Sequence, residues 1–388
     1  MLRNLPFLSI GFRPFFIGAA IHSLLSIIIW GFVYFYKLDL FLLNMSPFEW
    51  HAHSMIFGYT LAVIAGFLLT AVSNWTGLEI LSGKYLLLLF TIWVIARFLW
   101  YFNFYFGVIG GIFDIIFIII LLITLTLPII KVKKYKQLVI ISKLFIILIA
   151  YFIFILGYLN FLNNGMYFGI YLALILELSM ILTILNRIFP GFTKSGLNLS
   201  ESIYSPAWID KASILLSLSW LIFFLFFKEL FFTSLLAFSM FIVLSIRLWY
   251  WHHRSLWKYP LLWSLYLALF FICLGFLLLS LSYFFPYVYY LGIHSMTYGG
   301  IGLITLSMMC RVSLGHTGRN VKTNYPLINL SLIIFSLGAI SRVILPLVFN
   351  SYANWFLLIS EFFWLISFFT FLYFYLPILI KPRLKKHL

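Results

Sequence analysis

Two histidines stand close together at the start of an apolar segment, in the stretch FEWHAHSMIFGY at residues 48–59. His51 and His53 carry imidazoles, which bind metals and haem iron, and Met55 carries a thioether, which suits copper better than zinc. Ionisable side chains inside a membrane are costly, and they mark functional sites unless they pair structurally. The stretch therefore predicts either a metal or haem site, or an interfacial aromatic belt whose histidines only form hydrogen bonds.

Helix geometry refines the first alternative. Residues two apart on an α-helix point about 200° away from each other, so His51 and His53 are expected to face different neighbours. Met55 follows His51 by four residues and is expected on the same face. One helix can therefore serve two centres, one on each side.

The composition indicates a helical membrane protein. Of the 388 residues, 64% are hydrophobic and only 9% are charged, whereas soluble domains carry about 25% charged residues. Apolar runs of about 20 residues follow one another almost without pause, which predicts an all-α polytopic protein with a single membrane domain over residues 1–388. The twelve expected spans cover residues 14–36, 50–73, 85–101, 105–130, 137–160, 165–187, 211–230, 232–250, 260–283, 287–310, 325–348 and 354–380.

The net charge of +16 follows the membrane topology. With the N-terminus in the cytoplasm, only four of the 25 basic residues fall toward the outer side, namely Lys37, Arg97, Lys228 and Arg342. Because positive charge collects on the inner side, both termini are expected in the cytoplasm. The basic charge is therefore not a nucleic-acid footprint, and the expected surroundings are membrane lipid.

The topology brings distant histidines to one depth. The second and tenth spans both run inward, so His51, His53 and His294 are expected near the outer face. His316 lies 22 residues after His294, which is about 33 Å along a continuous helix. His316 is therefore expected on the inner side.

Two arginines are expected at the same depth as these histidines, near the outer face. Arg97 and Arg342 lie near the outer ends of the third and eleventh spans, and buried arginines need anionic partners. Glu49, Asp39 or the propionates of a haem can supply them, since arginine binds carboxylates with two parallel hydrogen bonds.

Three acids lie deeper within spans, at Asp114, Glu177 and Glu361. They predict either proton relay or pairing with Asn, Ser or Tyr. His22, alone on an apolar span, is expected to be a packing residue with satisfied hydrogen bonds.

A second group of polar residues is expected on the inner side. Helix ends that contain Gly and Thr need capping, so this group favours a structural lock of buried hydrogen bonds over a seat for a second cofactor or an anion. The group comprises Arg13, Asn74, Trp75, Thr76, Arg187, Thr193, Arg311, His316, Thr317 and Arg319.

Two long motifs resemble a known family. WHAHSMIFGYTLAVIAGFLLTAVSNWTG at 50–77 and LGIHSMTYGGIGLITLSMMCRVSLGHTGR at 291–319 are similar to the hallmark segments of NnrS proteins. Shorter matches occur at FRPFF (12–16), NRIFPGFT (186–193) and RLWYWHHRSLWKYPLLW (247–263). The resemblance implies a bacterial cytoplasmic-membrane protein that contains haem and copper, acts in nitric oxide metabolism or protection against nitrosative stress, and uses a redox partner.

The resemblance also implies ligands. His294 is the expected haem ligand on one side of the iron and His53 or His51 on the other, while the remaining histidine, helped by Met55, is available to copper. His316 also matches the family motif and is counted among the candidate metal ligands. In this interpretation Arg97 and Arg342 hold the haem propionates.

Two departures qualify the resemblance. Ser54 stands where family members usually have Glu, and Tyr266 where many have His, so any role of those family residues is in doubt here. Haem-copper oxidases, also of twelve spans, ligate a haem from their second and tenth spans. The sixth and seventh spans of this chain carry no histidine, so the copper site of those oxidases is not expected.

Two other classes of function compete with a haem protein. Twelve spans and the acids Asp114 and Glu177 also suit a proton-coupled transporter of a metal, haem or a small anion. A membrane sensor whose haem only reports nitric oxide is the third alternative.

Overall fold

The computed structural model describes residues 5–37, 44–227 and 230–384. Within these residues most of the chain is helical and no strand occurs, so the predicted all-α class is confirmed. The physical reason is that a segment in lipid must satisfy its own backbone hydrogen bonds, and an α-helix does this within one segment.

The described chain falls into two compact units. Unit 1 comprises Met1–Glu177, Val312–Arg319 and Phe371–Leu388. Unit 2 comprises Leu178–Arg311 and Asn320–Thr370. The prediction of one membrane domain over residues 1–388 stays a prediction.

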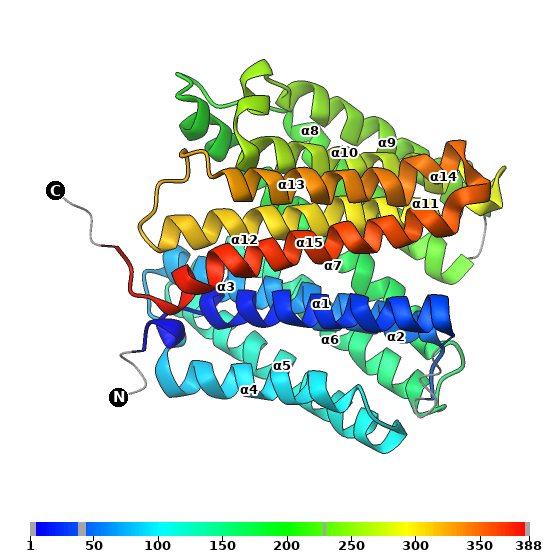
Figure 1. Ribbon diagram of the computed structural model, residues 1–388, viewed down its shortest axis with the longest axis horizontal. Coiled ribbons are helices and arrows are strands. Elements are labelled where there is room, and N and C mark those ends of the chain that lie inside the picture. Colours follow the sequence, from blue (N-terminus) through cyan, green and yellow to red (C-terminus); the bar gives the residue numbers. More distant parts are fainter. Residues whose placement is uncertain (1–4, 38–43, 228–229, 385–388) are drawn as a thin grey trace. The chain divides into compact units, whose positions relative to one another are not determined.

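The α-helices follow the predicted apolar segments closely (Figure 1). The helices of the first half are α1 (Phe12–Tyr36), α2 (Pro47–His53), α3 (Leu61–Thr76), α4 (Gly83–Leu99), α5 (Phe104–Lys131), α6 (Leu138–Tyr158) and α7 (Gly165–Leu197). Those of the second half are α8 (Ala207–Ile222), α9 (Leu230–Trp251), α10 (Pro260–Leu281), α11 (Tyr289–His294), α12 (Leu303–His316), α13 (Pro326–Ala339), α14 (Leu345–Val348) and α15 (Ala353–Ile380).

In the part of the chain that the structure describes, four π-helical segments interrupt or extend these helices. They are Ser54–Thr60, Phe223–Phe227, Ser295–Gly302 and Ile340–Ile344. The first joins α2 to α3, the third joins α11 to α12, and the fourth joins α13 to α14. Such segments insert an extra residue into a helical turn and are frequent at functional sites.

Ten helical stretches of the described chain are long and apolar enough to cross a bilayer, where the sequence predicts twelve. The predicted span 85–101 is α4, whose 17 residues rise only about 26 Å against a hydrocarbon core of about 30 Å. The predicted span 287–310 lies in a continuous helical stretch, from α11 to α12. Its many Gly, Ser and Thr residues make it less apolar than the ten.

Helices that are neighbours in sequence pack together within each unit (Figure 1). In unit 1, α1 packs on α3, α4 on α5, and α5 on α6. In unit 2, α8 packs on α9, and α10 packs on α9, on α11 and on the π-helical segment Ser295–Gly302. The segments that carry the predicted histidines therefore lie against other helices of their own unit.

Candidate functional site

A capping box begins the helix that carries His51 and His53. The Ser46 hydroxyl accepts a hydrogen bond from the Glu49 backbone N–H at 3.3 Å, and the Glu49 carboxylate accepts one from the Ser46 N–H at 2.7 Å. This reciprocal pair satisfies two amides of the first turn. Glu49 therefore caps the helix and is not the partner of an arginine. Asp39, the other predicted partner, lies outside the described residues.

The two histidines face different helices, as their spacing predicts. The His51 ring stacks on Trp30 of α1, with ring centroids 4.3 Å apart. The His53 side chain is fully buried and lies between Trp100 and Phe154 of α6, at centroid distances of 4.2 and 5.0 Å. His51 is only partly buried, so the two imidazoles have unlike environments.

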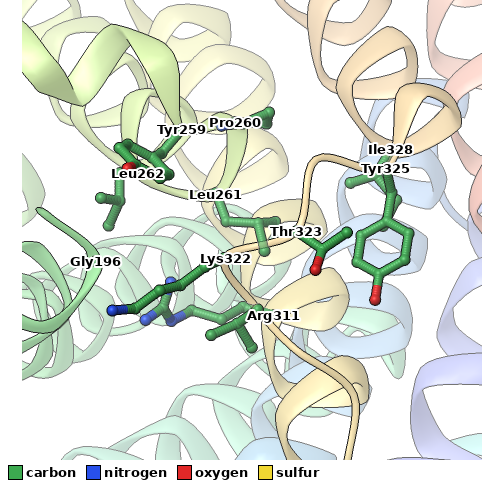
Figure 2. A pocket seen from close by; sticks show the side chains of 11 residues that line it. Gly196, Tyr259, Pro260, Leu261, Leu262, Arg311, Lys322, Thr323, Tyr325 and Ile328 are labelled. Atoms are coloured by element: carbon green, nitrogen blue, oxygen red, sulfur yellow. The ribbon is translucent and has the colours of Figure 1, made fainter.

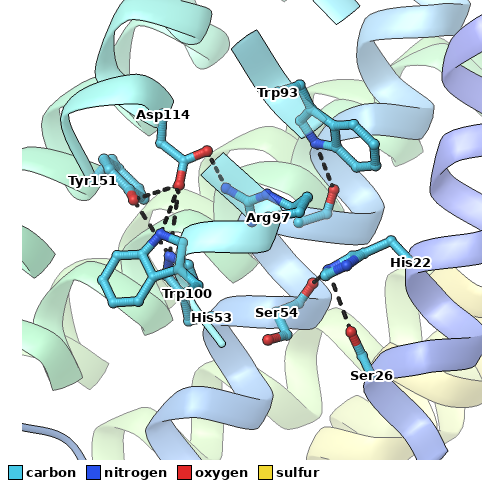
Figure 3. Close-up of polar contacts among 10 residues, drawn as sticks. His22, Ser26, His53, Ser54, Trp93, Arg97, Trp100, Asp114 and Tyr151 are labelled. Atoms are coloured by element: carbon cyan, nitrogen blue, oxygen red, sulfur yellow. Dashed lines mark hydrogen bonds and ion pairs between the residues drawn. The ribbon is translucent and has the colours of Figure 1, made fainter. Parts of the chain in front are cut away.

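Asp114 of α5 is the centre of a buried polar cluster in unit 1 (Figure 3). Its carboxylate forms an ion pair with Arg97 of α4 and accepts hydrogen bonds from Trp100 Nε1 at 3.0 Å and from the Tyr151 hydroxyl at 2.7 Å. His53 Nε2 lies 4.0 Å from the same carboxylate. The charge of Arg97 is therefore compensated by the chain's own carboxylate, which sequence reasoning did not predict.

These contacts fix the protonation of His53. Its Nε2 lies 3.3 Å from the Tyr151 oxygen. Because the Tyr151 hydroxyl donates to Asp114, its oxygen accepts from His53, so Nε2 carries the proton and Nδ1 the lone pair. His53 Nδ1 is buried and has no hydrogen-bond partner among the described residues.

The unpartnered nitrogen fits a metal ligand. Histidines that bind metals usually donate their other ring N–H to a carboxylate, a carbonyl or water, which fixes the tautomer. Here the His53 N–H donates to the Tyr151 hydroxyl, which in turn donates to the Asp114 carboxylate. A buried acceptor without a partner is also costly, and a metal ion on Nδ1 would satisfy it.

His22 of α1 is a packing residue, as predicted. Its Nε2 donates to the Ser54 carbonyl at 3.0 Å, and its Nδ1 accepts from the Tyr101 hydroxyl at 3.3 Å. The contact with Ser54 joins α1 to the π-helical segment that follows His53.

Gly58 of this π-helical segment lies next to His22 of α1 and Arg97 of α4. A Cβ at Gly58 would meet His22 Nε2 at 2.2 Å and the Arg97 guanidinium at 3.0 Å. We expect Gly58→Ala to lower the free energy of unfolding by about 1–3 kcal/mol, because overpacking displaces neighbouring groups. Gly191→Ala is the control, since nothing lies within 4 Å of a Cβ there. Thermal unfolding of both purified variants measures the difference, and an equal response of the two would contradict it.

The tautomer of His294, in α11, is also fixed by its hydrogen bonds. Its Nδ1 lies 2.8 Å from the Tyr290 carbonyl, one turn earlier, and therefore donates to it. Nε2 then carries the lone pair, which accepts a hydrogen bond from the Arg342 guanidinium at 3.0 Å. A backbone-supported Nδ1–H and a partly buried Nε2 lone pair together fit an axial ligand of haem iron.

The surroundings of His53 and His294 correspond. Each begins a His-Ser-Met sequence that enters a π-helical segment at the serine. Each has an arginine on the next long helical stretch and an acid on the one after it. The pairs are Arg97 with Asp114 in unit 1 and Arg342 with Glu361, which interact electrostatically, in unit 2. The repeated His-Ser-Met sequence is the feature from which this correspondence could have been predicted. That an arginine and an acid accompany each copy is visible only in the folded structure.

Two members of the second predicted polar group, Arg13 and His316, make contacts within unit 1. Arg13 donates to the Leu379 and Lys381 carbonyls at 2.8 and 2.6 Å and so caps the end of α15, where helix carbonyls lack internal partners. His316 packs against the Phe12 ring, with centroids 5.7 Å apart. These contacts are structural, and they leave the predicted role of His316 as a metal ligand a prediction.

Two of the shorter family motifs meet within unit 2. Arg247 of α9 is fully buried and donates hydrogen bonds to Asn186, and at 2.8 Å to Asp210. These contacts join the motifs at 186–193 and 247–263 through the start of α8. Tyr266, at the position where many family members have His, donates to the Leu248 carbonyl at 3.1 Å.

Residues 5–37, 44–227 and 230–384 contain no group of three or more His, Cys, Asp or Glu side chains arranged to hold a metal ion. Haem does not require such a group, because one or two axial ligands hold its iron. The donor geometry of His53 and His294 is therefore compatible with haem, and His53 Nδ1 also with copper.

Fold and site together define a helical integral membrane protein in which neighbouring groups fix the tautomers of a buried histidine, His53, and a partly buried one, His294. The chain belongs to the NnrS family, described as NnrS protein, which it matches over residues 6–383. No curated protein matches the chain.

Proposed function

We propose that this protein is a haem-containing membrane protein of nitric oxide metabolism or of protection against nitrosative stress. The observation that carries the proposal is the His294 imidazole, whose Nδ1–H is held by the Tyr290 carbonyl and whose Nε2 lone pair lies beside Arg342. Membership of the NnrS family supports the link to nitric oxide.

In this proposal His294 holds the haem iron, and Arg342 interacts with a propionate. Arg342 now donates to His294 Nε2, so haem binding requires the guanidinium to turn from the imidazole toward a carboxylate. His51 and His53 of unit 1 remain predicted cofactor ligands. Haem supplies an iron that binds nitric oxide when one coordination position is open and transfers electrons when both are filled.

Copper is the second proposed cofactor. His53 Nδ1 is a buried ring nitrogen without a hydrogen-bond partner among the described residues, and Met55 follows two residues later. Because the π-helical segment begins at Ser54, the α-helical periodicity that predicted a shared face for His51 and Met55 ends there. The structure thus supports His53 as the histidine available to copper.

The proposal predicts a nitric-oxide-sensitive spectrum. The full-length protein, purified in detergent from haem-replete cells, is expected to show a Soret band, with iron and copper found in the same sample. A Soret band that shifts on addition of nitric oxide would show an accessible iron, whereas an unresponsive band would indicate a closed centre that transfers electrons. A protein without colour and without metal contradicts the proposal.

One observation favours the transporter alternative. Glu177 of α7 is fully buried, and neither carboxylate oxygen has a hydrogen-bond partner among the described residues. An acid of this kind within a membrane span is the type of group that binds a coupling proton. A colourless, metal-free protein would therefore favour a transporter in which Glu177 binds the coupling proton.

A further inference from the structure

A small pocket in unit 2 brings together two basic side chains (Figure 2). Its walls come from the end of α7, the start of α10, the last part of α12, the following loop and the start of α13. Arg311 and Lys322 line the pocket, and none of its lining residues is acidic.

Arg311 is buried without an anionic partner. Its side chain is 8% exposed, and the guanidinium lies 3.8 Å from the Phe192 ring centroid. It makes no hydrogen bond or ion pair with the residues that the structure describes. Stacking on an aromatic ring leaves the guanidinium edge and its N–H donors available. A buried arginine without an anion is costly, so this arrangement points to an anionic ligand.

Lys322 brings a second positive charge to the same pocket. Its ammonium donates one hydrogen bond, of 2.6 Å, to the Asn198 side-chain oxygen, which leaves two of its three N–H donors. Asn198 is neutral, so it orients Lys322 without compensating the charge. Two cations facing one space repel each other unless an anion lies between them.

Two helix N-termini add to this positive potential. α10 begins at Pro260 and α13 at Pro326, and neither has a side-chain cap. Pro260 and Pro326 have no N–H, and the Leu262 N–H donates to the Tyr259 carbonyl at 2.9 Å, so the other amides of each first turn are the ones without a carbonyl partner in the helix. The N-terminus of a helix also carries about half a positive charge. Tyr259, Pro260, Leu261 and Tyr325 of these termini line the pocket.

We infer that this pocket binds a phosphate group, held by Arg311, Lys322 and the amides at the starts of α10 and α13. Arginine forms paired hydrogen bonds to phosphate oxygens, and helix N-termini bind phosphate through their free amides. α10 and α13 both belong to candidate membrane spans, so the pocket lies where a span ends. Anionic lipid headgroups and free phosphate share the required chemistry, and basic pockets between membrane helices bind such headgroups.

The test measures ligand-induced stabilisation of the full-length protein in detergent. Thermal unfolding midpoints are compared with phosphatidylglycerol or phosphatidylcholine added to the micelles, and with sodium phosphate or sodium chloride at equal ionic strength. Stabilisation by phosphatidylglycerol above phosphatidylcholine identifies the lipid headgroup. Stabilisation by sodium phosphate above chloride identifies free phosphate. An equal response within both pairs overturns the inference.

Substitutions assign the effect to the pocket. Arg311→Met and Lys322→Met are each expected to weaken the apparent affinity about tenfold or more, because a hydrogen bond to a charged group is lost. Lys258→Met is the matched control, since Lys258 is an exposed cation near the start of α10 outside the pocket lining. Lys322 is also exposed, so its variant tests the site even where Arg311→Met fails to fold. Equal losses in Lys258→Met would show general charge attraction and overturn the inference.

This binding assay does not depend on haem or on nitric oxide. Its result is therefore separate from that of the proposed function.

Discussion

Asp114→Asn is expected to lower the free energy of unfolding by about 3–5 kcal/mol, because it leaves the Arg97 guanidinium buried without a counter-charge. Both partners lie inside unit 1, with side chains 6% and 1% exposed. The substitution keeps the shape of the side chain and removes its charge. Arg97→Met makes the reciprocal change and is expected to cost a similar amount, since it strands the carboxylate.

The double variant Arg97→Met/Asp114→Asn provides the decisive comparison. With both charges of this pair removed, neither partner is left as an unpaired buried charge, so the double variant is expected to be more stable than either single variant. Denaturant or thermal unfolding in detergent measures the stability of the unsubstituted protein, the two single variants and the double variant. Strictly additive losses would show that the two side chains stabilise the protein independently and that the ion pair has no net coupling.

His294→Ala is expected to reduce bound haem about tenfold or more, the second large effect. Loss of a proposed axial imidazole removes the bond to iron, and even loss of groups that only support a metal ligand costs 10–100-fold in affinity. Haem per polypeptide is measured from the absorption of the purified variant. His252→Ala is the matched control, because His252 is an exposed histidine of the same unit.

Chemical rescue separates ligation from folding. His294→Gly grown or purified with imidazole is expected to recover haem, since free imidazole can occupy the space of the missing ring. Arg342→Met keeps the imidazole and removes its neighbour, so it is expected to retain haem with lower affinity. Full haem content in both His294→Ala and His53→Ala would refute the proposed ligands.

The sequence by itself determined which segments are helices of a membrane protein. A span needs about 20 apolar residues because the bilayer has a fixed thickness, and this requirement is visible along one segment without knowledge of its neighbours. The spans predicted at residues 105–130 and 354–380 therefore agree closely with α5 (Phe104–Lys131) and α15 (Ala353–Ile380). The divergence of His51 and His53 followed from helical periodicity for the same local reason.

Only the tertiary structure decided the partners of the buried charges. Arg97 is paired with Asp114, whereas Glu49, which the sequence offered as a partner, caps its own helix. Tyr151, far along the chain, completes the support of His53. Partner choice depends on which side chains face each other across two packed helices, and no local pattern encodes that. The π-helical segments after His53 and His294 are likewise set by packing, because their extra residue relocates side chains that an α-helical count places elsewhere.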